Sequence, residues 1–135
     1  AIGQPLLSSD DDFSRVENAI VDWTKDYDDG ETAIVFMGHG TSADSNGVYQ
    51  KMQDLLTKDG HTNYFVGTVE ATPSLDDVMA AVKKGNYKRD KDSWKSQFEA
   101  AGYQVECLLR GLGENETIRQ IYVEHAQAAI DSLNQ

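Results

Sequence analysis

The sequence predicts an α/β domain in which a mostly parallel sheet lies between layers of helices, a three-layer sandwich. Short apolar runs of strand length alternate with segments whose apolar residues recur every three or four positions. The runs are apolar on both faces, which is typical of parallel strands that helices cover on either side. With 135 residues, the chain has the length of one domain, residues 1–135.

The first predicted element is a helix that begins at the acidic triplet Asp10-Asp11-Asp12. Its apolar residues are three or four positions apart and therefore share one face: Phe13, Val16, Ile20, Trp23 and Tyr27. The triplet supplies an N-cap and places negative charge at the positive end of the helix dipole. Asp28-Asp29-Gly30 is typical of a helix end.

Two strand and helix pairs follow in alternation. Residues 33–37 and 63–69 are the predicted strands. The helix between them carries Tyr49, Met52, Leu55 and Leu56, and ends near Asp59-Gly60. The next helix opens at Ser74, which forms a capping box with Asp77, and ends at Lys83-Lys84-Gly85. Its apolar face consists of Leu75, Val78, Met79 and Val82.

The alternation breaks after residue 85, where a third strand is expected. Residues 86–92 are polar, and a helix over 93–101 follows directly. A strand over 104–109 and a final helix complete the chain, and the face of that helix holds Ile118, Tyr122, Ala126, Ala129 and Leu133. A right-handed crossover needs a strand between two such helices. We interpret the break as a missing strand and loop between residues 89 and 92; a plain helix-loop-helix is the alternative.

The best candidate site consists of His39 and Glu70, which follow the first and second predicted strands. Open α/β sheets bind ligands outside the carboxyl ends of their strands. An imidazole and a carboxylate there can hold a divalent transition ion or act as an acid–base pair. In the alternative interpretation, His39 only satisfies loop carbonyls and Glu70 caps the next helix.

The loop around His39 adds groups that suit ligand binding. Gly38 and Gly40 allow a bulky ligand to approach the backbone closely. Thr41 and Ser42 offer hydroxyl groups and a helix cap. We therefore include Gly38, Gly40 and Thr41 among the predicted binding residues.

Other residues of chemical interest are predicted to be structural. We expect His61 to be solvated, His125 to pack on the last helix, and Cys107 to be an inert thiol in a buried strand. Residues 10–12 are a cap rather than a metal site, and residues 83–89 form a solvated basic patch. The glycine-rich loop Gly111-Leu112-Gly113-Glu114-Asn115 has the geometry to hold an anion on free N–H groups, but it lacks the phosphate-loop spacing.

Composition excludes several classes of function. Lys and Arg number 12 and Asp and Glu 23, so the net charge is −11, which disfavours nucleic-acid binding. No apolar run approaches the roughly 20 residues that cross a bilayer. A single cysteine excludes an intrachain disulfide and a multi-cysteine zinc site. Residues 1–7 lack the features of a signal peptide.

An ordered series of motifs resembles the anaerobic sirohydrochlorin cobaltochelatases, members of the chelatase superfamily that includes ferrochelatase. The motifs are Met37-Gly38-His39-Gly40-Thr41, Val69-Glu70, Asp92-Ser93-Trp94-Lys95 and residues 111–115. Family members are about twice as long, with two similar halves around a tetrapyrrole cleft, and this chain resembles the second half. The resemblance implies a chelatase-like fold.

The resemblance also implies a reaction and its residues. It implies insertion of Co²⁺ into sirohydrochlorin, or its precorrin-2 form, in anaerobic cobalamin biosynthesis, with Fe²⁺ or Ni²⁺ as alternative metals. His39 and Glu70 match the family's metal-binding histidine and glutamate, and His39 also matches a group that assists pyrrole deprotonation. The family's further histidine, in a Gly-Asp-His segment, is absent where it should fall, between Arg89 and Asp92.

Partners, compartment and alternative functions complete the expectations. The implied partner is a tetrapyrrole, with no nucleic acid and no membrane; the oligomeric state is open, a homo-oligomer included. The family's usual location favours the cytoplasm, with the periplasm as the alternative. A non-catalytic metal or tetrapyrrole carrier would use the same site. A histidine phosphatase-like hydrolase is disfavoured because Gly38 stands where an Arg should bind phosphate.

Overall fold

A computed structural model describes residues 2–42, 44–84, 94–108 and 110–134. The chain forms two compact units. The first consists of Ala1–Trp23 and Leu109–Gln135, and the second of Thr24–Leu108. The second unit contains both strands of the structure and both residues of the candidate site.

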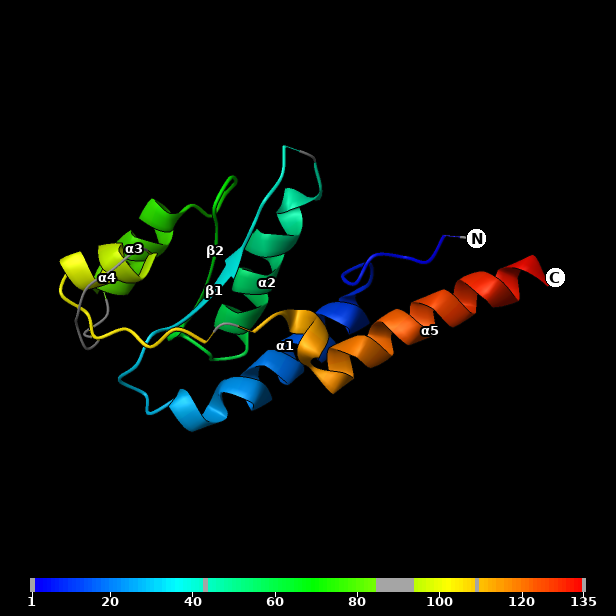
Figure 1. The fold of residues 1–135 in the computed structure, drawn as a ribbon, viewed down its shortest axis with the longest axis horizontal. Coiled ribbons are helices and arrows are strands. Elements are labelled where there is room, and N and C mark those ends of the chain that lie inside the picture. Colours follow the sequence, from blue (N-terminus) through cyan, green and yellow to red (C-terminus); the bar gives the residue numbers. More distant parts are fainter. Residues whose placement is uncertain (1, 43, 85–93, 109, 135) are drawn as a thin grey trace. The chain divides into compact units, whose positions relative to one another are not determined.

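The first unit pairs two helices from opposite ends of the chain. They are α1 (Asp10–Thr24) and α5 (Glu116–Leu133), and a short 3₁₀ turn, η3 (Leu112–Glu114), precedes α5. The Arg15 guanidinium donates two hydrogen bonds, of 2.6 and 3.0 Å, to the Glu124 carboxylate. This contact ties α1 to α5, which lie side by side in Figure 1.

The start of α1 follows the capping-box pattern, with a different cap from the one predicted. Ser9 Oγ accepts from the N–H of Asp12, and the Asp12 carboxylate accepts from the N–H of Ser9. The cap is therefore Ser9, and Asp12 is its partner three residues later. The prediction that the acidic triplet has a capping role is correct, but the identity of the cap residue was wrong.

Two predicted apolar faces are only partly buried. In α1, Phe13, Val16 and Ile20 are buried, whereas Tyr27 is exposed because the helix ends at Thr24 and a 3₁₀ turn, η1 (Lys25–Tyr27), follows. In α5, the buried residues are Ile118 and Ile121.

The predicted face of α5 is wrong beyond its first residues. Tyr122 is 50% exposed and Leu133 is 66% exposed. Periodicity identifies the residues that share a face, but it does not show how far along the helix that face is covered.

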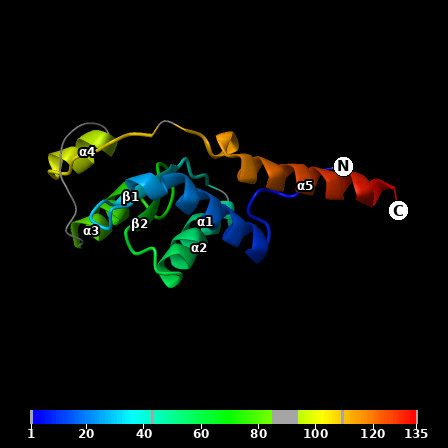
Figure 2. The same ribbon diagram turned by 90° about the horizontal axis from the view of Figure 1, so that it is seen from below.

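The second unit is built on two parallel strands with helices on both sides. β1 (Ile34–Gly38) pairs with β2 (Tyr64–Thr68), from Ile34 opposite Tyr64 to Gly38 opposite Thr68. The α/β class and the parallel pairing are as predicted, and the sheet has two strands in the parts of the chain that the structure covers. Figures 1 and 2 show α2 (Gly47–Lys58) on one side of the strands, and α3 (Leu75–Lys84) and α4 (Trp94–Ala100) on the other.

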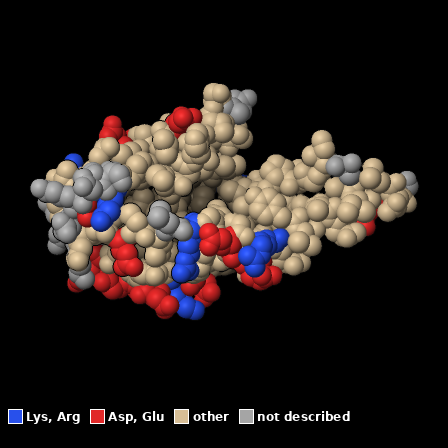
Figure 3. All heavy atoms as spheres, viewed as in Figure 1, with Lys and Arg blue, Asp and Glu red and all other residues tan. Residues whose placement is uncertain are grey.

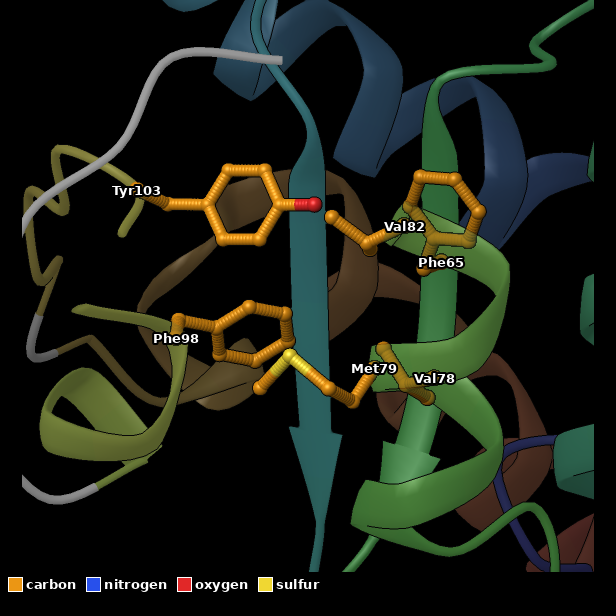
Figure 4. Packing of buried hydrophobic residues seen from close by; sticks show 6 residues of the cluster. All are labelled: Phe65, Val78, Met79, Val82, Phe98 and Tyr103. Carbon is orange, nitrogen blue, oxygen red and sulfur yellow. The ribbon is translucent and has the colours of Figure 1, made fainter. Parts of the chain in front are cut away.

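A hydrophobic cluster fills the space between β2, α3 and α4 (Figure 4). It contains Phe65, Val78, Met79, Val82, Phe98 and Tyr103. The rings of Phe98 and Tyr103 meet edge to face, with centroids 6.2 Å apart. At Gly67 a Cβ would lie 2.8 Å from the Trp94 ring and 2.7 Å from Val78, so the lack of a side chain lets α3 and α4 approach the strand.

Side-chain and loop groups cover the edge of β2 that faces away from β1. Gln53 of α2 donates from Nε2 to the Tyr64 carbonyl at 3.0 Å and accepts at Oε1 from the Val66 N–H at 2.8 Å. Farther along the edge, the Thr68 N–H donates to the Pro73 carbonyl at 2.7 Å. These bonds satisfy backbone groups that a neighbouring strand would otherwise use.

The strand predicted over residues 104–109 is wrong for its described part. Residues 104–108 have no strand structure, and Glu106, Cys107 and Leu108 are exposed. Cys107 is therefore an exposed thiol, not the buried one predicted. A strand needs a sheet edge to satisfy its backbone, and sequence alternation does not show whether an edge is within reach. The predicted missing strand between residues 89 and 92 lies outside the described residues.

The surface carries the strong negative charge of the sequence. Figure 3 shows acidic side chains spread over one face, with basic side chains among them. In the basic patch predicted for residues 83–89, Lys83 and Lys84 are exposed as expected, and the rest falls outside the described ranges. None of the helices described is both long and apolar enough to cross a membrane.

Candidate metal centre

His39 lies directly after β1, at the carboxyl end of the sheet. Its side chain is 76% exposed. The backbone of this loop is bonded to the end of β2, because the N–H of Val69 donates to the Gly38 carbonyl at 3.1 Å and that of Glu70 donates to the His39 carbonyl at 2.9 Å. The hydrogen bonding between the two segments therefore continues past the ends of β1 and β2. As a result, His39 lies beside Glu70.

The turn that carries Glu70 is held by a buried hydroxyl at the end of β2. Thr68 is 1% exposed, and its Oγ1 donates to the Pro73 carbonyl at 3.0 Å and accepts from the Ala71 N–H at 3.0 Å. The Thr68 side chain thus ties the end of β2 to the residues that follow Glu70. The carboxylate itself is 62% exposed.

The two candidate side chains lie close together. His39 Nδ1 is 3.8 Å from Glu70 Oε2 and 2.9 Å from the Gly40 carbonyl oxygen. A carbonyl only accepts hydrogen bonds, so Nδ1 carries the hydrogen and the lone pair of Nε2 is free for a metal ion. Histidine ligands in metal sites commonly donate their other N–H to a backbone carbonyl in this way.

The structure bears on both alternatives to a metal site. The cap of α3 is the reciprocal pair Ser74 and Asp77, as predicted, and not Glu70. The alternative that Glu70 is a helix cap is therefore wrong. The other alternative, that His39 satisfies a loop carbonyl, is partly correct, because its Nδ1 bonds the Gly40 carbonyl. This bond uses one of the two ring nitrogens and leaves Nε2 for a ligand.

The two glycines beside His39 make room for protein groups. A Cβ on Gly38 would lie 2.3 Å from Cε1 of Tyr49, and one on Gly40 would lie 2.8 Å from the Cβ of Ala71. Gly40 also has φ of +81°, a conformation that favours glycine. Both positions are thus explained by packing, and their contact with a ligand stays a prediction.

An open hollow of about 400 Å³ adjoins Glu70. Thr41, predicted as a binding residue, lines it together with Gln50 and Thr72. The N–H of Thr41 donates to Asn46 Oδ1 at 2.9 Å, so the loop is tied to the start of α2. Ser42 is exposed. The hollow offers oxygen and amide groups to a ligand beside the carboxylate.

His39 and Glu70 supply two ligands at most to one ion. Within the ranges that the structure describes, no group of three or more His, Cys, Asp or Glu side chains could hold a metal. With these two side chains as its ligands, an ion would have its other positions open to water or substrate. That suits transient holding and release of a cation better than a closed structural site.

The other candidate residues have structural partners. The His61 ring is half-buried against Tyr64, with ring centroids 5.4 Å apart. The prediction that His61 is solvated was therefore wrong. In the glycine-rich loop, the N–H of Gly111 donates to Glu114 Oε1 at 3.0 Å, and Asn115 caps α5 through the Ile118 N–H. The Glu114 carboxylate thus accepts the Gly111 N–H, which is then not available to bind an anion.

His125 and Asp12 form a pair in the first unit. His125 Nε2 lies 3.1 Å from Asp12 Oδ1, and Nδ1 lies 3.1 Å from the Gln4 carbonyl, in keeping with the predicted packing role. Burial favours a raised pKa for Asp12, but the hydrogen bonds from Ser8 and Ser9 outweigh it and lower the pKa to about 2.

Sequence reasoning missed two residues that shape the site. Thr68 was assigned to a strand and Tyr49 to an apolar helix face, yet both contact the loops that carry the candidate ligands. A hydroxyl at the end of a strand buried on both faces is a usable signal, because such a group must find hydrogen-bond partners. The contact of Tyr49 with the loop depends on the tertiary structure and has no signal in the sequence.

The chain matches a known family and two curated relatives. The model of the family described as cobalt chelatase (CbiK) matches residues 1–91 and 87–131. The sirohydrochlorin cobaltochelatase CbiKC of Nitratidesulfovibrio vulgaris is 28% identical over 98% of this chain and 54% of its own length. The sirohydrochlorin cobaltochelatase of Salmonella typhimurium is 30% identical over 96% of this chain and 56% of its own.

The chain spans about half the length of these two relatives. The family model nevertheless covers nearly all of its residues, in two segments that overlap at 87–91. The chain therefore belongs to the CbiK family of cobalt chelatases.

Proposed function

We propose that this chain acts in the insertion of Co²⁺ into sirohydrochlorin, with His39 and Glu70 as the residues that hold the ion. Membership of the CbiK family supports the reaction, and the names of both relatives supply the substrate. The observation that carries the site is the proximity of the two side chains at the carboxyl end of the sheet, where the His39 ring lies with its Nδ1 atom 3.8 Å from Glu70 Oε2. The family usually works in the cytoplasm, and we propose that compartment on the resemblance alone.

Insertion exchanges one cation for two protons. Sirohydrochlorin loses two pyrrole N–H protons as its nitrogens take up Co²⁺. The Nε2 atom of His39 and a carboxylate oxygen of Glu70 hold the partly hydrated ion and then release it to the ring nitrogens. A base near neutrality must accept these protons. Once the ion has left it, the imidazole can accept one of them at Nε2, and the other passes to the Glu70 carboxylate or to water.

Exposure of the site supports its use by a large substrate. The side chains of His39 and Glu70 are 76% and 62% exposed, so a flat macrocycle can reach both. Neither His39 nor Glu70 selects strongly among Co²⁺, Fe²⁺ and Ni²⁺, because imidazole accepts all three. We propose Co²⁺ on the strength of the family.

A carrier function is the second candidate. The chain spans about half of its relatives, and its two ligands are open to solvent. Both features are compatible with binding of metal or tetrapyrrole without turnover. A carrier would give at most one metallated ring per protein chain, whereas an enzyme would give many.

The test is metallation of sirohydrochlorin by the 135-residue protein with Co²⁺, followed by absorbance. We expect more than one product per chain in the wild type and a rate at the uncatalysed background with His39→Ala. His61→Ala is the matched control, because His61 lies on another loop of the second unit. Loss of turnover in His39→Ala together with retained turnover in His61→Ala would support the proposed site. Unchanged turnover in His39→Ala would remove His39 as the ligand.

A further inference from the structure

The Tyr49 side chain contacts the backbone on both sides of His39. A Cβ on Gly38 would lie 2.3 Å from Tyr49 Cε1, so the aromatic ring rests directly on Gly38. The N–H of Gly40 donates to Tyr49 Oη at 3.4 Å. We propose that Tyr49 is a positioning residue that holds the His39 imidazole with Nδ1–H on the Gly40 carbonyl and Nε2 free for the cation. The metal-binding part of this proposal rests on the proposed function.

Gly40 links Tyr49 to the histidine. Its N–H faces Tyr49 Oη, and its carbonyl accepts from His39 Nδ1 at 2.9 Å. The N–H and the carbonyl of Gly40 belong to the two peptide groups on either side of one Cα, whose φ is +81°. A change in the contact with Tyr49 therefore reaches the imidazole through two hydrogen bonds.

The loop is held on its other side by the end of β2. The N–H of Glu70 donates to the His39 carbonyl, and Ala71 lies against Gly40. These are backbone and methyl contacts that fix where the loop lies. They do not bond the imidazole. On its Nδ1 side the ring faces the Gly40 carbonyl at 2.9 Å and the Glu70 carboxylate at 3.8 Å, and only the carbonyl is within hydrogen-bond distance.

The ring and the hydroxyl of Tyr49 have separable effects. The half-buried ring packs on Gly38, and its loss should lower stability. Within the described residues, the hydroxyl has one hydrogen-bond partner, the Gly40 N–H. Tyr49→Phe keeps the ring and removes that contact, whereas Tyr49→Leu removes both. Tyr27→Phe is a matched control, because Tyr27 is an exposed tyrosine of the same unit, outside the site.

The first measurement is the tautomer of His39 in the metal-free full chain at alkaline pH, from the ¹⁵N shifts of the imidazole. We expect the Nδ1–H form in the wild type and in Tyr27→Phe, and a mixture of both tautomers in Tyr49→Phe. A wild-type tautomer in Tyr49→Phe would overturn the proposal. This result does not depend on chelatase activity.

The second measurement is Co²⁺ affinity, followed by the visible absorption of the bound ion. We expect Tyr49→Phe to bind about fivefold more weakly, as loss of one neutral hydrogen bond implies. Its thermal midpoint and its KM for sirohydrochlorin should match those of the wild type. An unchanged affinity in Tyr49→Phe, with a lower midpoint in Tyr49→Leu, would make Tyr49 a packing residue and overturn the proposal.

The two proposals fail in different ways. If the wild type forms no metallated ring, the proposed function fails, while the tautomer of Tyr49→Phe still decides the role of Tyr49. If the wild type inserts Co²⁺ and Tyr49→Phe matches it in tautomer and affinity, the function stands and the positioning role fails.

Discussion

The Nδ1 atom of His39 lies 3.8 Å from Oε2 of Glu70, and the N–H of Glu70 donates to the His39 carbonyl at 2.9 Å. Hydrogen bonds of the backbone set the spacing of the two residues. Their exposed side chains are the groups proposed to bind the ion. We therefore expect substitution of either side chain to leave the pairing of β1 with β2 intact, so that effects on function can be separated from effects on folding.

Removal of the charge at Glu70 should weaken cation binding without unfolding the protein. We expect Glu70→Gln to lower Co²⁺ affinity at least tenfold, as loss of a metal-site group typically does. Because the carboxylate is 62% exposed, the thermal midpoint should stay within error of the wild type. Titration calorimetry measures the affinity, and Glu106→Gln, at another exposed glutamate of the same unit, is the control. A large drop in the midpoint of Glu70→Gln would instead indicate a structural role.

A methyl group at Gly38 should destabilise the second unit. Its Cβ would lie 2.3 Å from Tyr49 Cε1, and such overpacking typically costs about 1–3 kcal/mol. Chemical denaturation of Gly38→Ala measures the free energy of unfolding. At Gly47 a Cβ meets nothing within 4 Å, so Gly47→Ala should leave stability unchanged or raise it by up to about 1 kcal/mol. Equal effects at Gly38 and Gly47 would refute the packing of Tyr49 on the loop.

The Asp12 carboxylate should stabilise the protein above about pH 4 and cease to do so near pH 2. Its pKa is lowered from 3.8 to about 2 in the folded state, so folding favours the ionised form. At neutral pH Asp12→Asn should cost about 2 kcal/mol, and the difference from the wild type should shrink as the pH falls from about 4 to 2. Urea denaturation across this range measures it, with the exposed Asp26→Asn as control. A difference that does not vary with pH would contradict the ionic role of Asp12.

Truncation of Leu56 tests the burial of α2. The side chain is 0% exposed, so Leu56→Ala should lower the free energy of unfolding by about 2–5 kcal/mol. Leu133 is 66% exposed, and Leu133→Ala should change it by less than about 0.5 kcal/mol. Denaturant titration of both variants provides the comparison, and a small loss in Leu56→Ala would mean that α2 is not packed as described.

Local patterns in the sequence predicted most of the helices and strands. The runs at 33–37 and 63–69 became β1 and β2, each shifted by at most one residue at either end. Ser74 and Asp77 formed the predicted capping box. These features depend on side chains a few positions apart, which is why the sequence alone predicts them.

The wrong predictions concern partners that are distant in the chain. Residues 104–108 have the composition of a strand, but a strand exists only beside another strand. Tyr122 has the spacing of a buried residue, yet it is 50% exposed. The placement of His39 and Glu70 after two strands was predictable, because parallel strands end at one edge of a sheet. The contact of Tyr49 with Gly38 was not, because it joins a helix to a loop across the fold.

The Gln53 amide on the outer edge of β2 has a consequence for self-association. Bare strand edges invite pairing with other molecules and so promote aggregation. To add a strand on that flank, an incoming chain would have to break the bonds of Gln53 to Tyr64 and Val66, each worth about 1 kcal/mol. Together with the bond between the Thr68 N–H and the Pro73 carbonyl, Gln53 thus disfavours the addition of a further strand along that flank.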